Sequence, residues 1–344
     1  MKFKYSKLVV AMSVGLGLVY SAAASASAYN VLDLGNVDAT ALNNSGQVVG
    51  NSGNNAFITG ANGVGMTDLT TLGGNFSSAA GINNSGQVVG GSYTASGQQD
   101  AFITGTNGVG MTNLGTLGVI FGSGVATGSV ATGINDSGQV VGNSFTAMGQ
   151  QQAFITGANG VGMRGLGNLG VDSSSATGVN NSGQVVGNSY TPMGMEAFIT
   201  NGNQMYNVGN LGTNYMNVGY TNSAVAINNS GEVVGTYNLA ESGQFPFITG
   251  ANGVGMTNLG GLVGQFGGGT PSGINASGQV VGNSGKYAFI TGANGQGMTN
   301  LNSLAQLTGG NYFTSANGIN GKGQIIAMAS NKQSYLLTPV ATVP

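Results

Sequence analysis

Short apolar runs alternate with turns rich in Gly and Asn along almost the whole chain. The stretch INNSGQVVG at residues 82–90 places apolar residues on both sides of Asn-Ser-Gly, which is typical of two short strands joined by a tight turn. Close copies begin at residues 42, 134, 179, 227 and 274, and a divergent copy begins at residue 319. The recurrence predicts seven repeats of one structural unit.

Two further phrases recur in step with the first. Copies of AFITG begin at residues 56, 101, 153, 197, 246 and 288, and copies of MTNL begin at residues 66, 111, 163, 205, 256 and 298. In the second unit these phrases predict four strands, at residues 78–83, 87–92, 100–104 and 111–114. No stretch after residue 28 has sustained helical periodicity. The fold class is therefore predicted to be all-β.

Four strands in 40–50 residues is the period of a propeller blade, so we expect a seven-bladed β-propeller of four-stranded blades. The seventh unit has only three predicted strands, at residues 316–320, 324–330 and 334–338. Its missing fourth strand matches YNVLDLG, Tyr29–Gly35, at the other end of the chain. We expect this N-terminal strand to pair with the last blade and close the ring, since complementary partial units would serve no purpose in an open solenoid.

The first 28 residues have the features of a secretory signal peptide. Lys2, Lys4 and Lys7 precede an apolar run at residues 8–20, and an Ala-Ser-Ala cleavage pattern ends at Ala28. The apolar run is too short for a comfortable membrane span, and no span is expected in the mature chain. We therefore predict three segments: a signal peptide at 1–28, one propeller domain at 29–338 and a C-terminal tail at 339–344. The expected location is secreted, extracellular or at the cell surface.

Charge argues against nucleic acid as a partner. Removing the three leader lysines from the seven basic residues leaves four against nine acidic ones, a net charge of about −5. Nucleic-acid binding needs a basic surface. The chain has no Cys, which is compatible with secretion because a domain of this size can bury a core without disulfides.

The run AFITG-NGV-MT-LGTLGG-S-A-GIN-SGQVVG resembles the HAF-repeat proteins, a bacterial family of extracellular repeats. The resemblance covers residues 29–338 and implies location and architecture, since the family carries no established activity. The family's repeat has His before Ala-Phe and Trp in the third strand. In this chain the first position is never His, and the second is Thr. The corresponding positions hold Asn55, Asp100, Gln152, Glu196, Gln244-Phe245 and Tyr287. The strand order also resembles kelch-type propellers. TPVATVP at the C-terminus is similar to the segment before the sorting tail of PEP-CTERM surface proteins.

Residue types needed for several chemistries are missing. Without His or Cys there is no Ser-His triad, thiolate nucleophile or imidazole metal ligand. The acidic residues are scattered over different repeat positions, and Asp136 and Glu232 are interpreted as drift on solvated turns. The Asn-Gly turns contain no calcium-loop pattern. We therefore predict no catalytic residues, no metal site and no cofactor.

One Asn recurs in every copy of the opening phrase: Asn43, Asn83, Asn135, Asn180, Asn228, Asn275 and Asn320. We expect its side chain to cap the hairpin by binding backbone amides. A functional ring of Asn at a channel mouth is the alternative. The recurring Phe and Met residues are expected to pack between blades.

Loop length differs between the two ends of the predicted blades. The 1–2 and 3–4 turns are nearly constant, whereas the 2–3 and 4–1 connections vary, so all major length variation is expected on one face. Variable loops on a rigid scaffold often carry recognition, although loops also tolerate insertion without function. The long 4–1 links contain our binding candidates, Phe121, Tyr215, Tyr220 and Phe266.

Three functions remain open. The first is a non-enzymatic binding or extracellular-matrix module whose partner is a surface polysaccharide or a protein. The second is a self-assembling structural surface protein, since low charge and β-rich repeats favour association. The third is a polysaccharide-active enzyme that uses two carboxylates. The sequence does not specify the ligand or the oligomeric state.

Overall fold

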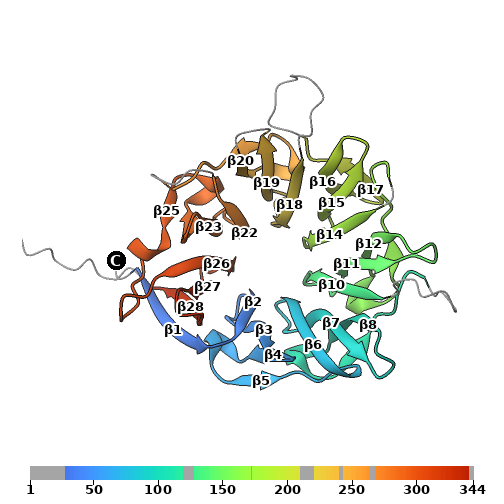
Figure 1. Cartoon of the computed structure of the whole chain (residues 1–344), viewed down its shortest axis with the longest axis horizontal. Helices are drawn as coiled ribbons and strands as arrows, with labels where there is room; N and C mark the ends of the chain where they lie inside the picture. The colour runs from blue at the N-terminus through green and yellow to red at the C-terminus, as the bar shows by residue number, and fades with distance from the viewer. Residues whose placement is uncertain are drawn as a thin grey trace, which may run out of the picture.

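The chain folds into a closed ring of seven four-stranded antiparallel sheets (Figure 1). The computed structural model describes residues 28–118, 128–171, 173–209, 221–239, 243–262 and 268–340. The predicted signal peptide lies outside the described residues, apart from Ala28, and so does the tail beyond residue 340. The seven-bladed propeller predicted from the repeats is confirmed.

Six blades are built from consecutive strands. Blade 1 contains β2 (Asp38–Leu42), β3 (Val48–Ser52), β4 (Asn55–Thr59) and β5 (Met66–Asp68); blade 2 contains β6 (Gly73–Ile82), β7 (Val88–Thr94), β8 (Gln99–Thr104) and β9 (Met111–Asn113); blade 3 contains β10 (Ser129–Ile134), β11 (Val140–Phe145), β12 (Gln151–Ile155) and β13 (Arg164–Gly165). Blade 4 contains β14 (Ser174–Val179), β15 (Val185–Thr191), β16 (Gly194–Asn201) and β17 (Gln204–Asn207); blade 5 contains β18 (Asn222–Ile227), β19 (Val233–Leu239), β20 (Gly243–Ile248) and β21 (Thr257–Asn258); blade 6 contains β22 (Thr270–Ile274), β23 (Val280–Ser284), β24 (Tyr287–Thr291) and β25 (Met298–Asn300).

Blade 7 joins the two ends of the described chain. It consists of β26 (Phe313–Ile319), β27 (Ile325–Ala329), β28 (Ser334–Pro339) and β1 (Tyr29–Gly35), with β1 on the outer edge. β1 pairs antiparallel with β28, from Tyr29 opposite Pro339 to Gly35 opposite Ser334. This pairing confirms the predicted ring closure, and it gives the outer edge of the seventh sheet a hydrogen-bonded partner.

Packing between neighbouring blades forms the core. The Phe of each third strand in blades 1–6 is fully buried: Phe57, Phe102, Phe154, Phe198, Phe247 and Phe289. Each contributes to a cluster with apolar residues of two neighbouring second strands, as Phe102 does with Val49 and Val88 and Phe57 does with Val48 and Ile326. The prediction that Phe packs between blades is confirmed. The Met residues at the fourth strands are partly buried and pack against these clusters in blades 2–6, as predicted, whereas Met66 is 42 % exposed.

Close contact between the first two strands of a blade requires glycine in the second. A Cβ on Gly142 would lie 2.0 Å from the backbone oxygen of Val130 and 2.9 Å from Cε1 of Phe154. The same position is Gly50, Gly90, Gly187, Gly235 and Gly282 in other blades, with equally close backbone oxygens. The recurring Val-Val-Gly therefore places two side chains in the core and allows the first strand to approach.

Six 3₁₀ turns complete the described structure: η1 (Ala61–Gly63), η2 (Thr106–Gly108), η3 (Ala158–Gly160), η4 (Ala251–Gly253), η5 (Ala293–Gly295) and η6 (Leu301–Ser303). The first five are the predicted 3–4 turns, and the middle residue of each is an Asn at φ of 52–57°. Asn tolerates this left-handed conformation better than most residues, which explains the repeated Ala-Asn-Gly. No helix in the described part of the chain is long and apolar enough to cross a membrane.

Candidate functional site

The two ends of the blades form two different faces. On one, which we call the turn face, the 3–4 turn of a blade packs on its 1–2 turn. Gly63 donates its backbone N–H to Gly46 over 2.9 Å, and Gly108 donates to Gly86 over 3.0 Å. On the other, which we call the loop face, the 4–1 link lies beside the connection between the second and third strands of the blade. In blade 7, for example, Ser330 N–H in this connection donates to the backbone oxygen of Tyr312 in the link. The described residues therefore confirm that the variable connections share one face.

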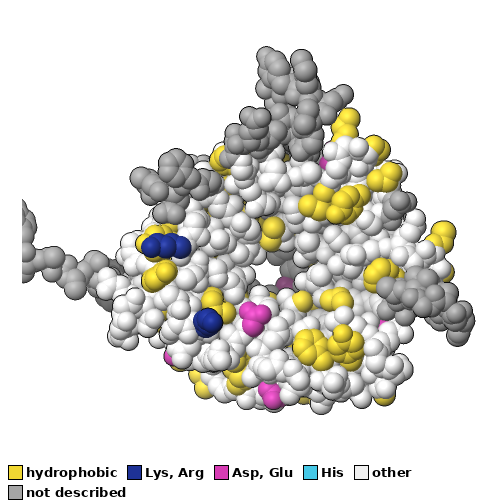
Figure 2. Space-filling model, viewed as in Figure 1, with side chains coloured by type: hydrophobic (Ala, Val, Ile, Leu, Met, Phe, Trp, Pro, Cys, Tyr) yellow, Lys and Arg dark blue, Asp and Glu magenta, His cyan; other side chains and the backbone are white. Residues whose placement is uncertain are grey.

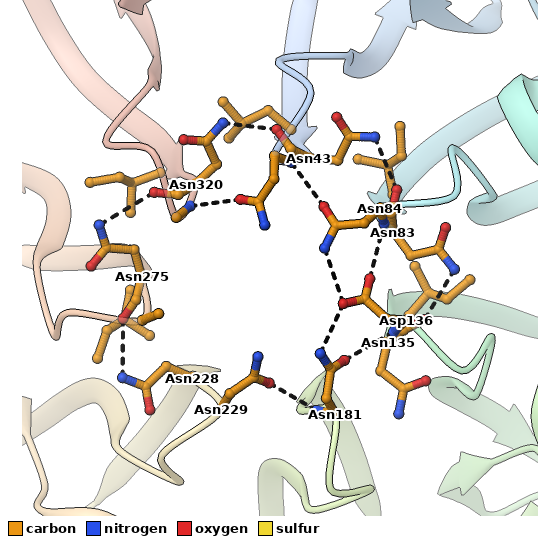
Figure 3. A pocket seen from close by; sticks show the side chains of 18 of the residues that line it. Asn43, Asn83, Asn84, Asn135, Asp136, Asn181, Asn228, Asn229, Asn275 and Asn320 are labelled. Carbon is orange, nitrogen blue, oxygen red and sulfur yellow. Dashed lines mark hydrogen bonds between the residues drawn. The ribbon is translucent and has the colours of Figure 1, made fainter. Parts of the chain in front are cut away.

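The axial channel opens on the turn face through a mouth lined by the 1–2 hairpins. Each hairpin contributes its recurring Asn and the apolar residue before it, among them Leu42 and Ile82. The mouth has a volume of about 210 Å³. Figure 2 shows the ring from the side opposite to Figure 3, with the central opening in a surface on which charged side chains are few and separated.

The recurring Asn caps its own hairpin, as predicted. Oδ1 of Asn83 accepts hydrogen bonds from the backbone N–H groups of Ser85 (3.1 Å) and Gln87 (3.0 Å). Nδ2 donates to Oε1 of Gln87 at 2.8 Å. Further backbone groups of the turn pair with one another, since Gly86 N–H donates to the Asn83 carbonyl and Asn83 N–H donates to the Gln87 carbonyl. One buried side chain thus satisfies most of the polar groups of the turn.

The same Asn also connects the blades. Nδ2 of Asn43 donates to the backbone oxygen of Asn83 at 3.0 Å, and Asn83 donates in the same way to Asn135 at 3.1 Å. The series continues around the ring and closes where Nδ2 of Asn320 donates to the oxygen of Asn43 at 2.8 Å (Figure 3). The remaining links are Asn135 to Asn180, Asn180 to Asn228, Asn228 to Asn275 and Asn275 to Asn320. We call these seven bonds the inner ring, and their polar atoms are fully used in structural contacts.

A second set of bonds, the outer rim, involves the residue after each recurring Asn: Asn44, Asn84, Asp136, Asn181, Asn229, Ala276 and Gly321. Asn44 N–H donates to Oδ1 of Asn84, and Asn181 N–H donates to Oδ1 of Asn229. Asn84 and Asp136 likewise donate to Asp136 and Asn181, and Gly321 donates to Asn44. Ala276 and Gly321 have no side-chain acceptor, so the outer rim is interrupted in blades 6 and 7.

Asp136 is the only ionisable residue among those that line the mouth. Its carboxylate accepts hydrogen bonds from Asn84 N–H (3.0 Å), Asn84 Nδ2 (3.0 Å) and Asn181 Nδ2 (2.8 Å). Burial raises the pKa of this carboxyl group, but the three hydrogen bonds outweigh burial and hold the pKa below its ordinary value of 3.8. Asp136 lies on an exposed turn, as predicted, and its carboxylate also links three blades.

Glu232 forms a hydrogen bond within its own hairpin. It occupies the position of the hairpin Gln, and its carboxylate accepts a hydrogen bond from Nδ2 of Asn228, as Gln87 does from Asn83. In four other blades the Gln also donates to the left-handed Asn of the next blade, as Gln47 Nε2 does to Asn107 Oδ1 at 3.2 Å. A carboxylate cannot donate that bond.

The loop face carries aromatic side chains at the ends of the second and third strands. Tyr287 and Tyr312 meet edge to face with ring centroids 5.7 Å apart, between blades 6 and 7. Nζ of Lys286 lies 5.1 Å from the Tyr287 centroid and 5.9 Å from the Tyr312 centroid. The four candidates Phe121, Tyr215, Tyr220 and Phe266 belong to links of this face but lie outside the described residues.

Further aromatic contacts flank the same face. Phe76 and Tyr93 meet edge to face in blade 2, and Tyr237 and Phe245 stack in blade 5. Tyr190 at the end of β15 is 53 % exposed. Sequence reasoning considered only the long links and missed these strand-end aromatics, although Tyr or Phe recurs after the Val-Val-Gly phrase, in Ser-Tyr and Ser-Phe.

Acidic residues do not gather into a metal or catalytic cluster within the described ranges. No group of three Asp or Glu side chains there is placed to hold an ion. Asp100 is the most buried, at 5 % exposure, and its carboxylate is bound by the side-chain amides of Gln98 and Asn113.

Comparisons with known proteins identify the architecture. No family model matches the chain, and no curated protein matches it. Among solved structures, YCF48 bound to D1 peptide aligns with a TM-score of 0.55 and 9 % identity, over 93 % of this chain and 98 % of that one. An oligogalacturonate lyase in complex with manganese aligns with a TM-score of 0.53 and 11 % identity, over 92 % and 94 %. TolB from Acinetobacter baumannii aligns with a TM-score of 0.47 and 9 % identity, over 84 % of this chain but only 60 % of that one. At these identities the likeness concerns the fold.

Proposed function

We propose that this propeller is a secreted or cell-surface binding module without enzymatic activity, and that it binds through the loop face. The observation that carries the proposal is the Lys286, Tyr287 and Tyr312 cluster among the variable connections. Aromatic faces with a nearby cation suit the apolar faces of sugar rings and the side chains of peptides. The leader sequence and the HAF-repeat resemblance support an extracellular location. The peptide complex of YCF48 is a precedent for ligand binding by this fold.

The absence of His and Cys and the scattered carboxylates support a non-enzymatic role. The likeness to an oligogalacturonate lyase makes hydrolysis or cleavage of polysaccharides worth a direct assay, with Asp→Asn and Glu→Gln variants as controls. Release of sugar by the native chain, lost in one such variant, would replace the binding proposal by an enzymatic one.

The test of binding compares two tyrosines on opposite faces. The full chain is screened on a glycan array and by pull-down of bacterial surface material, alongside Tyr287→Ala and Tyr206→Ala. Tyr206, in β17, is 47 % exposed and lies beside the turn face rather than on the loop face. We expect Tyr287→Ala to weaken binding by about tenfold, in line with the loss of one aromatic contact of about 1.4 kcal/mol. Binding that is equally strong in both variants would contradict the assignment to the loop face.

Self-assembly is a second candidate because the turn face exposes a repeated apolar side chain. The residue after the Asn-Gly of the 3–4 turn is Val64, Val109, Val161 or Val254 in four blades, each 69–73 % exposed. Exposed apolar groups with little surrounding charge favour association. Sedimentation of the native chain and a quadruple Val→Ser variant distinguishes the candidates, since a monodisperse native monomer at high concentration would exclude self-assembly.

A further inference from the structure

The interruption of the outer rim leaves two backbone donors at the axial mouth without an acceptor. In the described structure, neither the N–H of Asn229 nor that of Ala276 has a hydrogen-bond partner within the protein, and both residues are exposed. In five other blades the equivalent N–H donates to the side chain of the next blade at 2.9–3.0 Å. The difference arises from the sequence, because Ala276 and Gly321 stand where four other blades have Asn and one has Asp.

The chain itself indicates which chemical group fits these donors. Four of the five acceptors at equivalent positions are carboxamide oxygens, from Asn84, Asn181, Asn229 and Asn44. Blades 5 and 6, which carry these two donors, have the same hairpin: the caps of Asn228 and Asn275 match those of the other blades. Asn229 N–H and Ala276 N–H are therefore presented by the same backbone scaffold that binds a carboxamide elsewhere in the rim.

The electrostatics of the mouth favour a neutral ligand. Figure 3 shows Asp136 on the side of the ring opposite Asn275. Its carboxyl group, whose pKa lies below the ordinary value, is ionised at neutral pH, and no cationic residue is found among the described residues that line the mouth. An anion would be repelled by Asp136, and a cation would face the exposed N–H donors. A mouth of about 210 Å³ has room for a small neutral group, since a water molecule takes about 30 Å³.

We propose that the axial mouth on the turn face binds neutral carboxamide groups, whose oxygen accepts the hydrogen bond of Asn229 N–H or of Ala276 N–H, one carboxamide for each donor as elsewhere in the rim. Two sources present this chemistry: an Asn or Gln side chain of a partner protein, and the acetamido group of an N-acetylated sugar. The site goes beyond the proposed function because it lies on the face opposite the variable loops. Its success or failure is therefore independent of binding through Tyr287 and Tyr312.

The test follows backbone amide resonances of the full chain during titration with two probes. N-acetylglucosamine represents the sugar, and N-acetyl-asparagine amide represents the side chain. We expect at least one probe to shift the Asn229 and Ala276 signals in a saturable way, and the responding probe identifies the source. The key variant is Ala276→Asn, which supplies the acceptor found in other blades and should reduce the Asn229 shift at least fivefold.

Folding of the variant is expected because Asn occupies this position in blades 1, 2, 4 and 5. Slower hydrogen exchange of the Asn229 amide in Ala276→Asn would show that the new side chain accepts its hydrogen bond. Gln296→Val is the matched control, since it restores on the turn face the residue found in other blades and lies away from the mouth. The proposal is overturned if neither probe shifts the two amides, or if the shift persists unchanged in Ala276→Asn.

Discussion

The side-chain amide of Asn320 donates a hydrogen bond to the backbone oxygen of Asn43 at 2.8 Å, across a sequence separation of 277 residues. Both residues belong to 1–2 hairpins, one in the last blade and the other in the first. This bond closes the inner ring at the same junction where β1 and β28 pair. The ring is therefore joined twice, at its axis by side chains and at its outer edge by a strand.

Removing the Asn320 side chain should destabilise the closed ring. Asn320→Ala leaves the N–H groups of Lys322 and Gln324 without their partner and removes one of the two hydrogen bonds of the Asn43 carbonyl, which keeps that of Gly46 N–H, in a site where Asn320 is 5 % exposed. We expect a loss of about 2–3 kcal/mol in the free energy of unfolding, measured by denaturant titration. Asn54→Ala, an exposed loop position, should change it by less than about 0.5 kcal/mol. Equal effects would show that the inner ring contributes little.

Closure at the outer edge can be tested with two leucines of β1. Leu34 is buried in a cluster with Val48 and Phe57 of blade 1, whereas Leu32 is 40 % exposed. Leu34→Ala should reduce the free energy of unfolding by about 2–4 kcal/mol, because it leaves a cavity between the last blade and the first. Leu32→Ala is the matched control and should cost clearly less. Similar losses in the two variants would argue against tight packing of β1.

Much of this architecture could be predicted because each blade repeats the same local pattern. Asn83 and its turn identify a hairpin, Phe102 and its neighbours identify a third strand, and YNVLDLG completes the last unit. The outer rim could not be predicted. Whether Asn84 meets Asp136 depends on how two hairpins from successive blades approach at the axis, which the linear sequence does not encode. The aromatic cluster was also missed, since Tyr287 and Tyr312 belong to different blades.

The glycine of Val-Val-Gly should tolerate no side chain. In Gly142→Ala the new Cβ would meet the Val130 oxygen at 2.0 Å, and both groups belong to paired backbone that cannot move without disturbing the sheet. We expect a loss of about 3 kcal/mol or more in the free energy of unfolding. Gly170→Ala is the control, because its Cβ would have only Pro192 within 4 Å, at 3.6 Å. Thermal unfolding of the two variants checks the difference.

In the last blade the corresponding position is Ala327, and β26 has an additional register shift between Phe313 and Ser315. Blade 2 also has two register shifts although it retains Gly90, so the second shift is not specific to this copy; the last blade nevertheless accommodates the Cβ of Ala327, which is 1 % exposed. We therefore expect Ala327→Gly to have a much smaller effect than Gly142→Ala. A large gain in stability from Ala327→Gly would show that the blade is strained by its alanine.

Acid should weaken the outer rim through Asp136. The folded-state pKa of this carboxyl group lies below its ordinary value of 3.8, because its hydrogen bonds to Asn84 and Asn181 outweigh the opposing effect of burial. A group with a lowered folded-state pKa contributes stability above its unfolded pKa, and this contribution is lost as the pH falls through the folded value. The effect should therefore be confined to pH values below about 4, and it should be modest because the side chain is exposed.

The measurement compares urea unfolding of the native chain and Asp136→Asn between pH 7 and pH 3. The variant keeps an oxygen that can accept from Asn84 N–H, but it has no charge to lose. On acidification we expect the free energy of unfolding to fall more in the native chain than in Asp136→Asn. The difference in slope should correspond to a fraction of one proton bound by the Asp136 carboxylate on unfolding. Parallel pH profiles would mean that the three hydrogen bonds do not favour the ionised carboxylate. Glu232→Gln is the control, since it removes a different carboxylate from a hairpin and should leave the Asp136-dependent part of the profile in place.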